Sequence, residues 1–462
     1  MNESQIDLVS LPAIEANIHD HESRSFDASN FEPAQNTDST SRLPRTDGGK
    51  DAWLFLAACF ALEALIWGFP FTYGIFQDYY AKEPSFQGQT SIALIGTCSM
   101  GVLYLGAPFL FAGLTRWPQA RRACTYVGII IMCSALVLSS FATEVWHLTV
   151  TQGVLYSIGG GIAYSPMILF VHEWFVRKKG LAFGIMWAGT SVAGVLLPII
   201  MTSLLSRYGF RTALRIWAIV VAVIALPLLS FAKPRLPLST THHRAHSSSF
   251  RQLFDLSFLT MPYFLILQAC NIIESSGYFL PSLYLPTYAR DALHSSNLAS
   301  AFTVTAINGA TVVGTIVMGT LIDKFHVTTC IFVSTMGSTI CVFLLWGLAT
   351  DLPLLYVFAI TYGLFAGSFC ATWSGVIRDV QIRTDGKADA GLVFAFLAFG
   401  RGVGNVLSGP LSVVLIGGSG GHVWKGQAAG GFGSGYGPLI AFTGVSALLG
   451  GLSFVVKRIG WL

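Results

Sequence analysis

Three ionisable side chains stand inside long apolar runs of the sequence: Glu63, Glu274 and Arg401. A charge at the bilayer centre costs about 2.5 to 3.5 kcal/mol on insertion scales, so such a side chain normally faces a cavity or a partner. Arginine offers a fork of donors that suits a carboxylate, and a desolvated glutamate can take up a proton. The three residues therefore predict anion binding at Arg401 and proton uptake at Glu63 or Glu274. A buried ion pair that only joins two helices is the alternative.

The glycines around Arg401, in AFGRGVGN at 398–405, suggest a phosphate-binding loop at first sight. No strand signature precedes them and no GK[ST] follows, so their context argues against nucleotide binding. Glycines in apolar helices usually permit close helix approach, and we assign this role also to Gly180 and Gly184. The eight cysteines form no CxxC pair, and we expect neither a metal nor a cofactor.

The composition is that of a membrane protein. Hydrophobic residues make up 53% of the 462 residues and charged residues only 11%, whereas about 25% is usual in soluble domains. Beyond a polar stretch of 50 residues, apolar segments of about 20 residues follow one another, each long enough to cross a bilayer as a helix. The sequence predicts an all-α membrane protein with twelve transmembrane helices, at about 53–76, 91–113, 123–142, 147–170, 181–205, 211–231, 260–286, 299–321, 328–348, 353–376, 390–414 and 438–457.

Lys and Arg residues are unequally shared between the two sides of this predicted topology. Nineteen of the 27 lie on the side of the N-terminus and six on the other, while Arg24 and Arg401 fall outside the comparison. Because such an excess marks cytoplasmic loops, we expect both termini in the cytoplasm. The formal charge of +4 then reflects topology, and we expect no nucleic-acid partner. Residues 1–50 are predicted to form a disordered cytoplasmic tail.

The two halves of the chain resemble each other at a fixed offset. Glu63 and Pro70 recur 211 positions later as Glu274 and Pro281. The pattern predicts two six-helix bundles, 51–231 and 258–462, joined by a cytoplasmic linker at 232–257. Repeated halves are typical of secondary transporters, which bind substrate between them. Further matches are Gly180, Leu181, Phe183 and Gly189 with Gly391, Leu392, Phe394 and Gly400 (offset 211), and Gly101, Gly106 and Arg116 with Gly309, Gly314 and Lys324 (offset 208); Arg401 falls opposite Thr190.

Several motifs resemble those of the major facilitator superfamily, and within it the monocarboxylate porter family, especially its fungal members. WFVRKKGLAFGIMWAGTSVAG at 174–194 resembles that family's signature at the fifth span, and TDGGKDAW at 46–53 resembles its motif before the first. GTLIDKF at 319–325 is similar to the superfamily's loop after the eighth span. The resemblance implies the major facilitator fold. It also implies a gating role for Arg177, Lys178, Lys179, Asp323 and Lys324.

Three positions depart from the animal lactate porters of that family. Those proteins carry a lysine just after the Phe-Pro of the first span, where this chain has Phe71. They also carry an Arg and an Asp in the eighth span, where this chain has Thr311 and Thr315. A lactate symporter of the animal type is therefore not expected.

In this superfamily, spans 1, 7, 8 and 11 contribute to the central cavity. Polar residues at helical spacing place one polar face on each of the last three spans. Aromatic residues near the same cavity favour a bulky or flat substrate: Trp67, Tyr73, Trp187, Tyr278, Tyr284 and Trp373. The predicted substrate contacts are Arg401, Asn405, Asn271, Asn308, Thr311, Thr315 and Tyr278, and the predicted proton-coupling residues are Glu63 and Glu274.

The sequence thus predicts a proton-coupled secondary transporter that works by alternating access. Its substrate is expected to be an organic anion, a monocarboxylate or a bulkier secondary metabolite. The alternatives are an efflux pump for a fungal secondary metabolite or drug, and a nutrient sensor without transport. No cluster of His, Cys and carboxylates suggests an enzyme. We expect a monomer in the lipid bilayer, either of the plasma membrane or of a vacuole or another organelle, with a small-molecule substrate and protons as its partners.

Overall fold

The structure is a computed structural model that describes residues 43–87, 89, 91–236, 256–417 and 430–460. Most of the predicted tail (1–50) and of the predicted linker (232–257) lies outside these ranges. All regular secondary structure in the described part is helical, as predicted. The first half of the chain forms α1 (Lys50–Phe71), α2 (Tyr73–Lys82), α3 (Ile92–Leu105), α4 (Ala107–Arg116), η1 (Pro118–Ala120), α5 (Arg121–Ser139), α6 (Val145–Leu148), η2 (Thr149–Leu155), α7 (Tyr156–Trp174) and α8 (Lys179–Leu228).

The second half follows the same plan, with short helices between long ones. Its elements are η3 (Ser257–Thr260), α11 (Pro262–Tyr278), α12 (Leu280–Asp291), α13 (Asn297–Lys324), α14 (Val327–Ile340), η4 (Cys341–Trp346), α15 (Leu352–Phe365), η5 (Phe369–Thr372), α16 (Trp373–Arg383), α17 (Ala390–Gly417), η6 (Gly431–Gly433), α18 (Gly437–Gly450) and α19 (Leu452–Arg458).

Ten helical stretches within the described ranges are long and apolar enough to cross a membrane. This number differs from the predicted twelve for two reasons. The spans predicted at 181–205 and 211–231 appear as one helix, α8, which contains a single non-helical residue, Gly209, with φ of 72°. The span predicted at 260–286 falls on α11 and α12 and is not among the ten. The count of twelve therefore stays a prediction.

Prolines that recur in the repeat mark helix breaks in both halves. α1 ends just after Pro70, and the Thr72 hydroxyl donates a hydrogen bond of 2.7 Å to the Gly68 carbonyl. α12 begins just before Pro281. A proline has no N–H to donate, so it is favoured in the first turn of a helix and interrupts the hydrogen bonding of a longer one. The first break lies near the end of the span predicted at 53–76, and the second lies in the latter part of the span predicted at 260–286.

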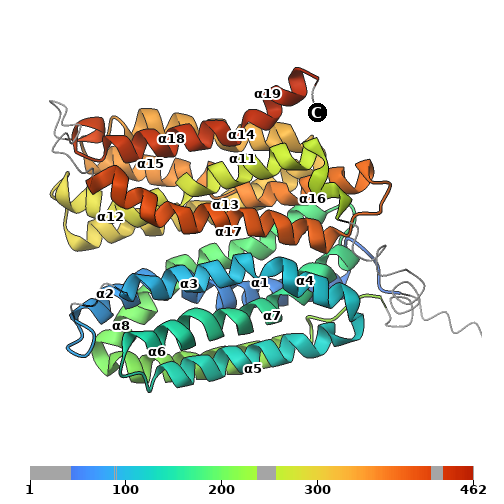
Figure 1. Ribbon diagram of the computed structural model, residues 1–462, viewed down its shortest axis with the longest axis horizontal. Coiled ribbons are helices and arrows are strands. Elements are labelled where there is room, and N and C mark those ends of the chain that lie inside the picture. Colours follow the sequence, from blue (N-terminus) through green and yellow to red (C-terminus); the bar gives the residue numbers. More distant parts are fainter. Residues whose placement is uncertain (1–42, 88, 90, 237–255, 418–429, 461–462) are drawn as a thin grey trace, which may run out of the picture. The chain divides into compact units, whose positions relative to one another are not determined.

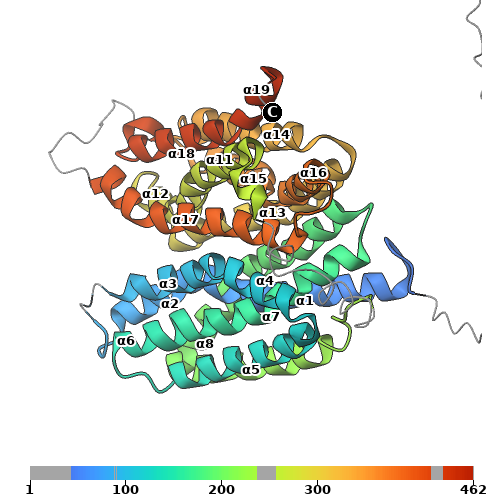
Figure 2. The ribbon, with the colours of Figure 1, turned by 45° about the vertical axis from the view of Figure 1, so that its right-hand side comes forward.

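Helices of the two halves meet along two seams. Figures 1 and 2 both show α1–α8 (blue to green) on one side and α11–α19 (yellow to red) on the other. α13 packs along α8, and α17 packs along α3 and α4. One hydrophobic cluster includes residues of both sides, among them Phe183, Trp373 and Phe394, while a smaller cluster around Trp346 belongs to the second half.

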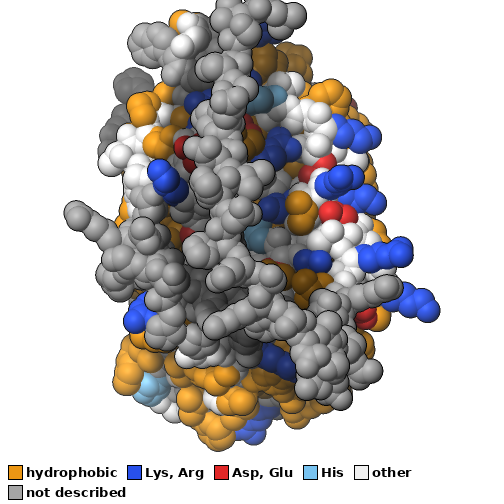
Figure 3. All heavy atoms as spheres, turned by 90° about the vertical axis from the view of Figure 1, so that its right-hand side faces the viewer, with side chains coloured by type: hydrophobic (Ala, Val, Ile, Leu, Met, Phe, Trp, Pro, Cys, Tyr) orange, Lys and Arg blue, Asp and Glu red, His pale blue; other side chains and the backbone are white. Residues whose placement is uncertain are grey.

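The exterior is apolar along the helices and basic at one end. Large apolar side chains such as Phe109 (79% exposed) and Leu298 (83% exposed) point outward, as expected for contact with lipid. Figure 3 shows many Lys and Arg side chains gathered at the end of the molecule where α4 and α16 finish. Those two helices end in Arg116 and Arg383.

Glycines allow the two halves to approach closely at the seam between α8 and α13. A Cβ added at Gly319 would collide with the carbonyl group of Gly180, and one added at Gly184 would collide with the carbonyl of Thr315. The predicted role of Gly180 and Gly184 in close helix packing is confirmed. By contrast, Gly309, on the same helix α13, has open space around it.

This contrast provides a matched test on one helix. We expect Gly319→Ala to lower the stability of the purified protein by about 1 to 3 kcal/mol, because the added methyl group must push α13 away from α8. Gly309→Ala should be neutral or slightly stabilising, because alanine favours the helix. Thermal melting in detergent measures both. Equal melting temperatures for the two variants would contradict the packing described here.

Candidate functional site

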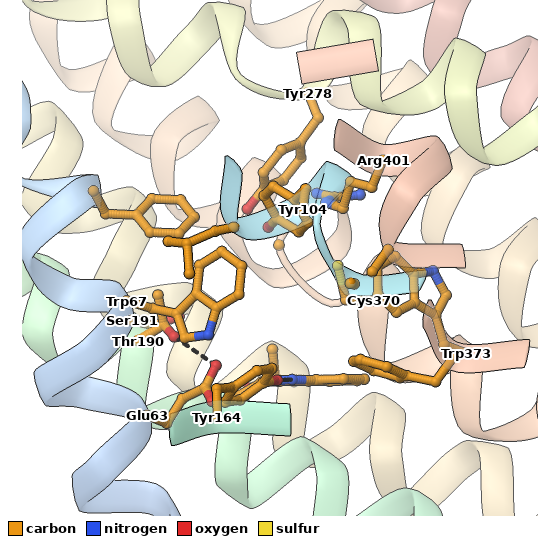
Figure 4. Close-up of a pocket in the computed structure, with 18 of the residues that line it drawn as sticks. Glu63, Trp67, Tyr104, Tyr164, Thr190, Ser191, Tyr278, Cys370, Trp373 and Arg401 are labelled. Carbon is orange, nitrogen blue, oxygen red and sulfur yellow. Dashed lines mark hydrogen bonds between the residues drawn. The ribbon is translucent and has the colours of Figure 1, made fainter. Parts of the chain in front are cut away.

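One pocket lies between the two halves and draws its walls from both. The first half contributes residues of α1, α3, α4, α7 and α8, and the second contributes residues of α11, α13, η5, α16 and α17. Figure 4 shows lining side chains that converge from opposite sides, with Trp67 and Glu63 on one side and Arg401 and Trp373 on the other. The lining consists of Glu63, Trp67, Phe71, Leu103, Tyr104, Ala107, Phe111, Gly161, Tyr164, Ser165, Trp187, Thr190, Ser191, Tyr278, Phe279, Asn308, Thr311, Thr315, Gly367, Cys370, Trp373, Phe394, Ala398 and Arg401.

Arg401 is buried at the pocket and already has an anionic partner. Its Nη1 donates to Glu274 Oε2 at 3.0 Å, and the two side chains are only 2% and 5% exposed. The Arg401 guanidinium carbon also lies 4.3 Å from the ring centre of Tyr278 and 5.6 Å from that of Phe279. Burial strengthens such a pair because the surrounding dielectric is low, and the aromatic faces add cation–π attraction. The sequence left Glu63, Glu274 and the substrate as possible partners of Arg401, and in the structure its partner is Glu274.

Glu63 occupies the equivalent place in the first half, without a cation. The Thr190 hydroxyl donates to Glu63 Oε1 at 3.0 Å, and this contact joins α1 to α8 as the Arg401–Glu274 pair joins α11 to α17. Both pairs have the same separation, 127 residues. The repeat predicted from the sequence thus extends to side-chain contacts. The two contacts differ in charge, because threonine stands in the first half where arginine stands in the second.

Ten of the 24 residues that line the pocket are aromatic. Trp67 packs against Tyr104 at a centroid distance of 4.8 Å and meets Tyr164 edge-on at 5.5 Å. Across the pocket, Trp373 meets Trp187 at 5.9 Å. Such rings offer large apolar faces that favour flat ligands.

The predicted site residues divide into two groups. Five of the seven predicted substrate contacts line the pocket: Arg401, Tyr278, Asn308, Thr311 and Thr315. The other two, Asn271 and Asn405, do not. Of the two predicted proton-coupling residues, Glu63 lines the pocket and Glu274 lies behind Arg401. Of the six aromatic residues expected near the cavity, Trp67, Trp187, Tyr278 and Trp373 line it, while Tyr73 and Tyr284 do not.

The residues outside the lining have other partners or another position. Asn271 Nδ2 donates to the Leu397 carbonyl at 2.8 Å, so this amide joins α11 to α17. Asn405 is half-buried one turn beyond Arg401. The hydroxyls of Tyr73 and Tyr284 bond to Ile92 O and Ser412 Oγ. Helical spacing placed these residues on polar faces, but such faces also contact neighbouring helices.

Sequence reasoning missed several lining residues. Tyr104, Tyr164 and Cys370 stand in apolar runs, where no spacing distinguishes them from packing residues. Thr190 was identifiable, because the repeat pairs it with Arg401 and pairs Glu63 with Glu274. The signal for the Thr190–Glu63 contact was therefore present in the offset of 211 residues.

The residues predicted to act in gating lie where the start of α8 meets the end of α13, outside the pocket lining. Asp323 accepts hydrogen bonds from the backbone N–H groups of Gly180 at 2.7 Å and Leu181 at 3.0 Å, and so links α13 to α8. This contact satisfies donors that are free at a helix N-terminus. Among the described residues, Asp323 forms no ion pair with Arg177, Lys178 or Lys179. The side chain of Lys324 is exposed.

A second carboxylate holds the segment just before α8. Asp47 Oδ1 accepts backbone hydrogen bonds of 2.9 Å from Val176, Arg177 and Lys178. Burial would raise the pKa of Asp47, but these three N–H donors outweigh it and the pKa lies below its ordinary value. Asp47 belongs to the TDGGKDAW motif, so two of the recognised motifs meet at one place in the fold.

Comparison with known proteins identifies the family. A profile described as "Major Facilitator Superfamily" matches residues 55–409, which is most of the chain. The chain belongs to the major facilitator superfamily. This membership and the ten apolar helical stretches make it a multi-pass membrane protein, and its relatives are transporters.

Three similar proteins within the superfamily come from fungi. The agnestins efflux protein of Paecilomyces divaricatus is 26% identical over 92% of this chain and 91% of its own length. The MFS-type transporter hasB of Aspergillus fumigatus is 30% identical over 71% of this chain and 74% of its own length. The fujikurins efflux protein of Gibberella fujikuroi is 27% identical over 70% and 68%.

The buried ion pair yields a prediction on stability. Either Arg401→Gln or Glu274→Gln should destabilise the protein by about 3 to 5 kcal/mol, because each leaves an uncompensated buried charge. The double variant should be destabilised by less than the sum of the two. Thermal melting of the purified protein in detergent gives the ranking.

The equivalent contact in the first half serves as the control. Thr190→Val removes a neutral donor and should cost only about 1 to 2 kcal/mol. Additive losses in the Arg401 and Glu274 variants would show that the two side chains do not interact as a pair.

Proposed function

We propose that this protein is a secondary active transporter that exports a bulky, largely apolar organic metabolite by alternating access. The observation that carries the proposal is a pocket lined by helices of both halves. In secondary transporters, rocking of one half against the other opens such a pocket to each side in turn. The glycine-mediated contact of α8 with α13 is the kind of seam along which this motion would occur.

The direction of transport rests on the relatives. Two of them are named as efflux proteins, for agnestins and for fujikurins. We therefore favour export over uptake. We also propose the plasma membrane as the site of action, with twelve spans and both termini in the cytoplasm. The basic end seen in Figure 3 supports this orientation, because positive residues gather on the cytoplasmic side.

The pocket wall supports a bulky substrate over a small acid. Phe71, Thr311 and Thr315 stand where the animal lactate porters carry charged residues, and all three line this pocket. Aromatic rings surround them. We therefore propose that the chain shares an ancestor with the monocarboxylate porters and has lost their small-acid site.

For the proton we propose Glu63. It is 3% exposed and faces the pocket, and in the described structure its hydrogen-bonding neighbours are two hydroxyls, that of Thr190, which donates to Oε1 at 3.0 Å, and that of Tyr164. An unpaired carboxylate at this depth is favoured in its protonated form unless a ligand compensates its charge. Glu274, by contrast, is held by Arg401.

A second candidate function is symport of an organic anion with a proton. The observation that favours it is that Arg401 itself lines the pocket. Protonation of Glu274 would release the guanidinium for a substrate carboxylate, so that anion and proton travel together. In that case Arg401→Ala should abolish transport while insertion into the membrane stays normal.

Everted plasma-membrane vesicles from yeast that expresses the chain would test the proposal. The vesicles, with an acidic interior, receive a mixture of small organic acids and apolar aromatic metabolites, and mass spectrometry measures what accumulates. We expect aromatic compounds to accumulate several-fold above vesicles without the protein. Glu63→Gln should abolish the dependence on the pH gradient and leave passive equilibration.

Two results would contradict the proposal. Accumulation of small acids alone would favour the anion symporter. Accumulation of aromatic compounds that depends equally on the pH gradient in wild type and Glu63→Gln would remove Glu63 from proton coupling.

A further inference from the structure

Three buried polar atoms of the pocket wall have no hydrogen-bond partner within the described residues: Glu63 Oε2, Trp67 Nε1 and Trp373 Nε1. Their side chains are 3%, 6% and 3% exposed. Buried polar groups are nearly always paired, because an unpaired one forfeits its hydration. Three unpaired groups around one pocket indicate a ligand that supplies the missing partners.

Other polar groups in the same wall pair with each other. Trp187 Nε1 donates to the Tyr164 hydroxyl at 3.0 Å, and the Thr190 hydroxyl donates to Glu63 Oε1 at 3.0 Å. Among the buried polar atoms of this pocket in the described structure, those left without a partner are thus one acceptor and two indole donors. Trp67 lies on α1 and Trp373 begins α16, so the donors come from opposite halves of the chain, and Figure 4 shows them on opposite sides of the pocket.

The charges in the pocket do not favour an anion. Arg401 is the cation in the lining, and Glu274 neutralises it at 3.0 Å while Tyr278 and Phe279 cover it. Glu63 would repel a carboxylate whenever it is ionised. A ligand carboxylate would thus meet a guanidinium whose charge Glu274 already neutralises, and it would add a second negative charge beside that pair.

We infer that the pocket binds an uncharged, planar aromatic molecule that carries a hydroxyl group and at least one carbonyl oxygen. The hydroxyl donates to Glu63 Oε2, carbonyl oxygens accept from Trp67 Nε1 and Trp373 Nε1, and the ring system packs against the aromatic wall. This inference names the substrate class of the transporter proposed above and rests on that proposal for transport, though not for binding.

The geometry also explains how such a substrate could exchange with a proton. A proton on Glu63 and the substrate hydroxyl both occupy Oε2, so each excludes the other. The proton neutralises the carboxylate in one state, and the hydrogen bond from the ligand hydroxyl stabilises the ionised carboxylate in the other. Export coupled to proton entry follows from this competition.

Binding to the purified full-length chain in detergent tests the inference with three matched probes. 6-Hydroxycoumarin carries the donor and the carbonyl, 6-methoxycoumarin lacks the donor, and coumarin-6-carboxylate places an anion at the same position. Calorimetric titration at neutral pH should give about tenfold tighter binding for the hydroxyl probe than for the methoxy probe, as expected for one hydrogen bond to a buried charged group, and the weakest binding for the carboxylate.

Variants locate the contacts. Trp373→Phe keeps the ring but removes the N–H, and should weaken binding of 6-hydroxycoumarin about fivefold. Trp346→Phe is the matched control, because Trp346 Nε1 is also buried without a partner in the described structure but lies outside the pocket. Glu63→Gln should abolish the preference for hydroxyl over methoxy.

Several outcomes would overturn the inference. They are carboxylate binding as tight as hydroxyl binding, equal effects of Trp373→Phe and Trp346→Phe, and no measurable binding of 6-hydroxycoumarin. The proposed function fails separately. If 6-hydroxycoumarin binds as expected but the vesicles accumulate no compound, the pocket assignment stands and transport does not.

Discussion

The pairing of Arg401 with Glu274 is the interaction on which the site depends. A guanidinium at membrane depth must be compensated, and here a carboxylate of the same half compensates it at 3.0 Å. The pair fixes α11 against α17 and removes the strongest attraction that the pocket could offer to an anion. What remains open to a ligand is an aromatic wall, one carboxylate and two indole N–H groups. The charge that the pocket offers to a ligand thus depends on an ion pair of which only one member, Arg401, lines the pocket.

The internal repeat gives this arrangement a physical origin. Glu63 and Glu274 occupy equivalent positions, and each meets the residue 127 positions further along the chain. One of these residues is Thr190 and the other is Arg401. The difference leaves one half with a compensated charge and the other with a carboxylate held by a neutral hydroxyl. A symmetric scaffold thereby separates an ion pair from the carboxylate to which we assign the proposed proton exchange.

The helical membrane architecture and the superfamily could be predicted from the sequence, because long apolar runs and loop motifs can be recognised without knowing which residues are in contact. Five of the seven predicted substrate contacts line the pocket. The partner of Arg401 could not be predicted from the sequence. Helical spacing shows which residues share one face of a helix, but it does not show which neighbouring helix that face contacts. Asn271 shows the same limit, since its amide bonds to the Leu397 carbonyl of the adjacent helix. Tyr104 and Tyr164 were missed because aromatic residues in apolar runs look alike whether they line a pocket or fill a core.

The central claim is that Glu63 exchanges protons while Glu274 stays ionised beside Arg401. Infrared difference spectroscopy of the purified protein during a pH change measures this directly, because a protonated carboxyl group has its own C=O stretching band. We predict a titrating carboxyl band that disappears in Glu63→Gln and persists in a Glu274→Gln variant that retains its fold. A band that persists in Glu63→Gln and disappears in Glu274→Gln would contradict the account and would free Arg401 to bind an anionic substrate.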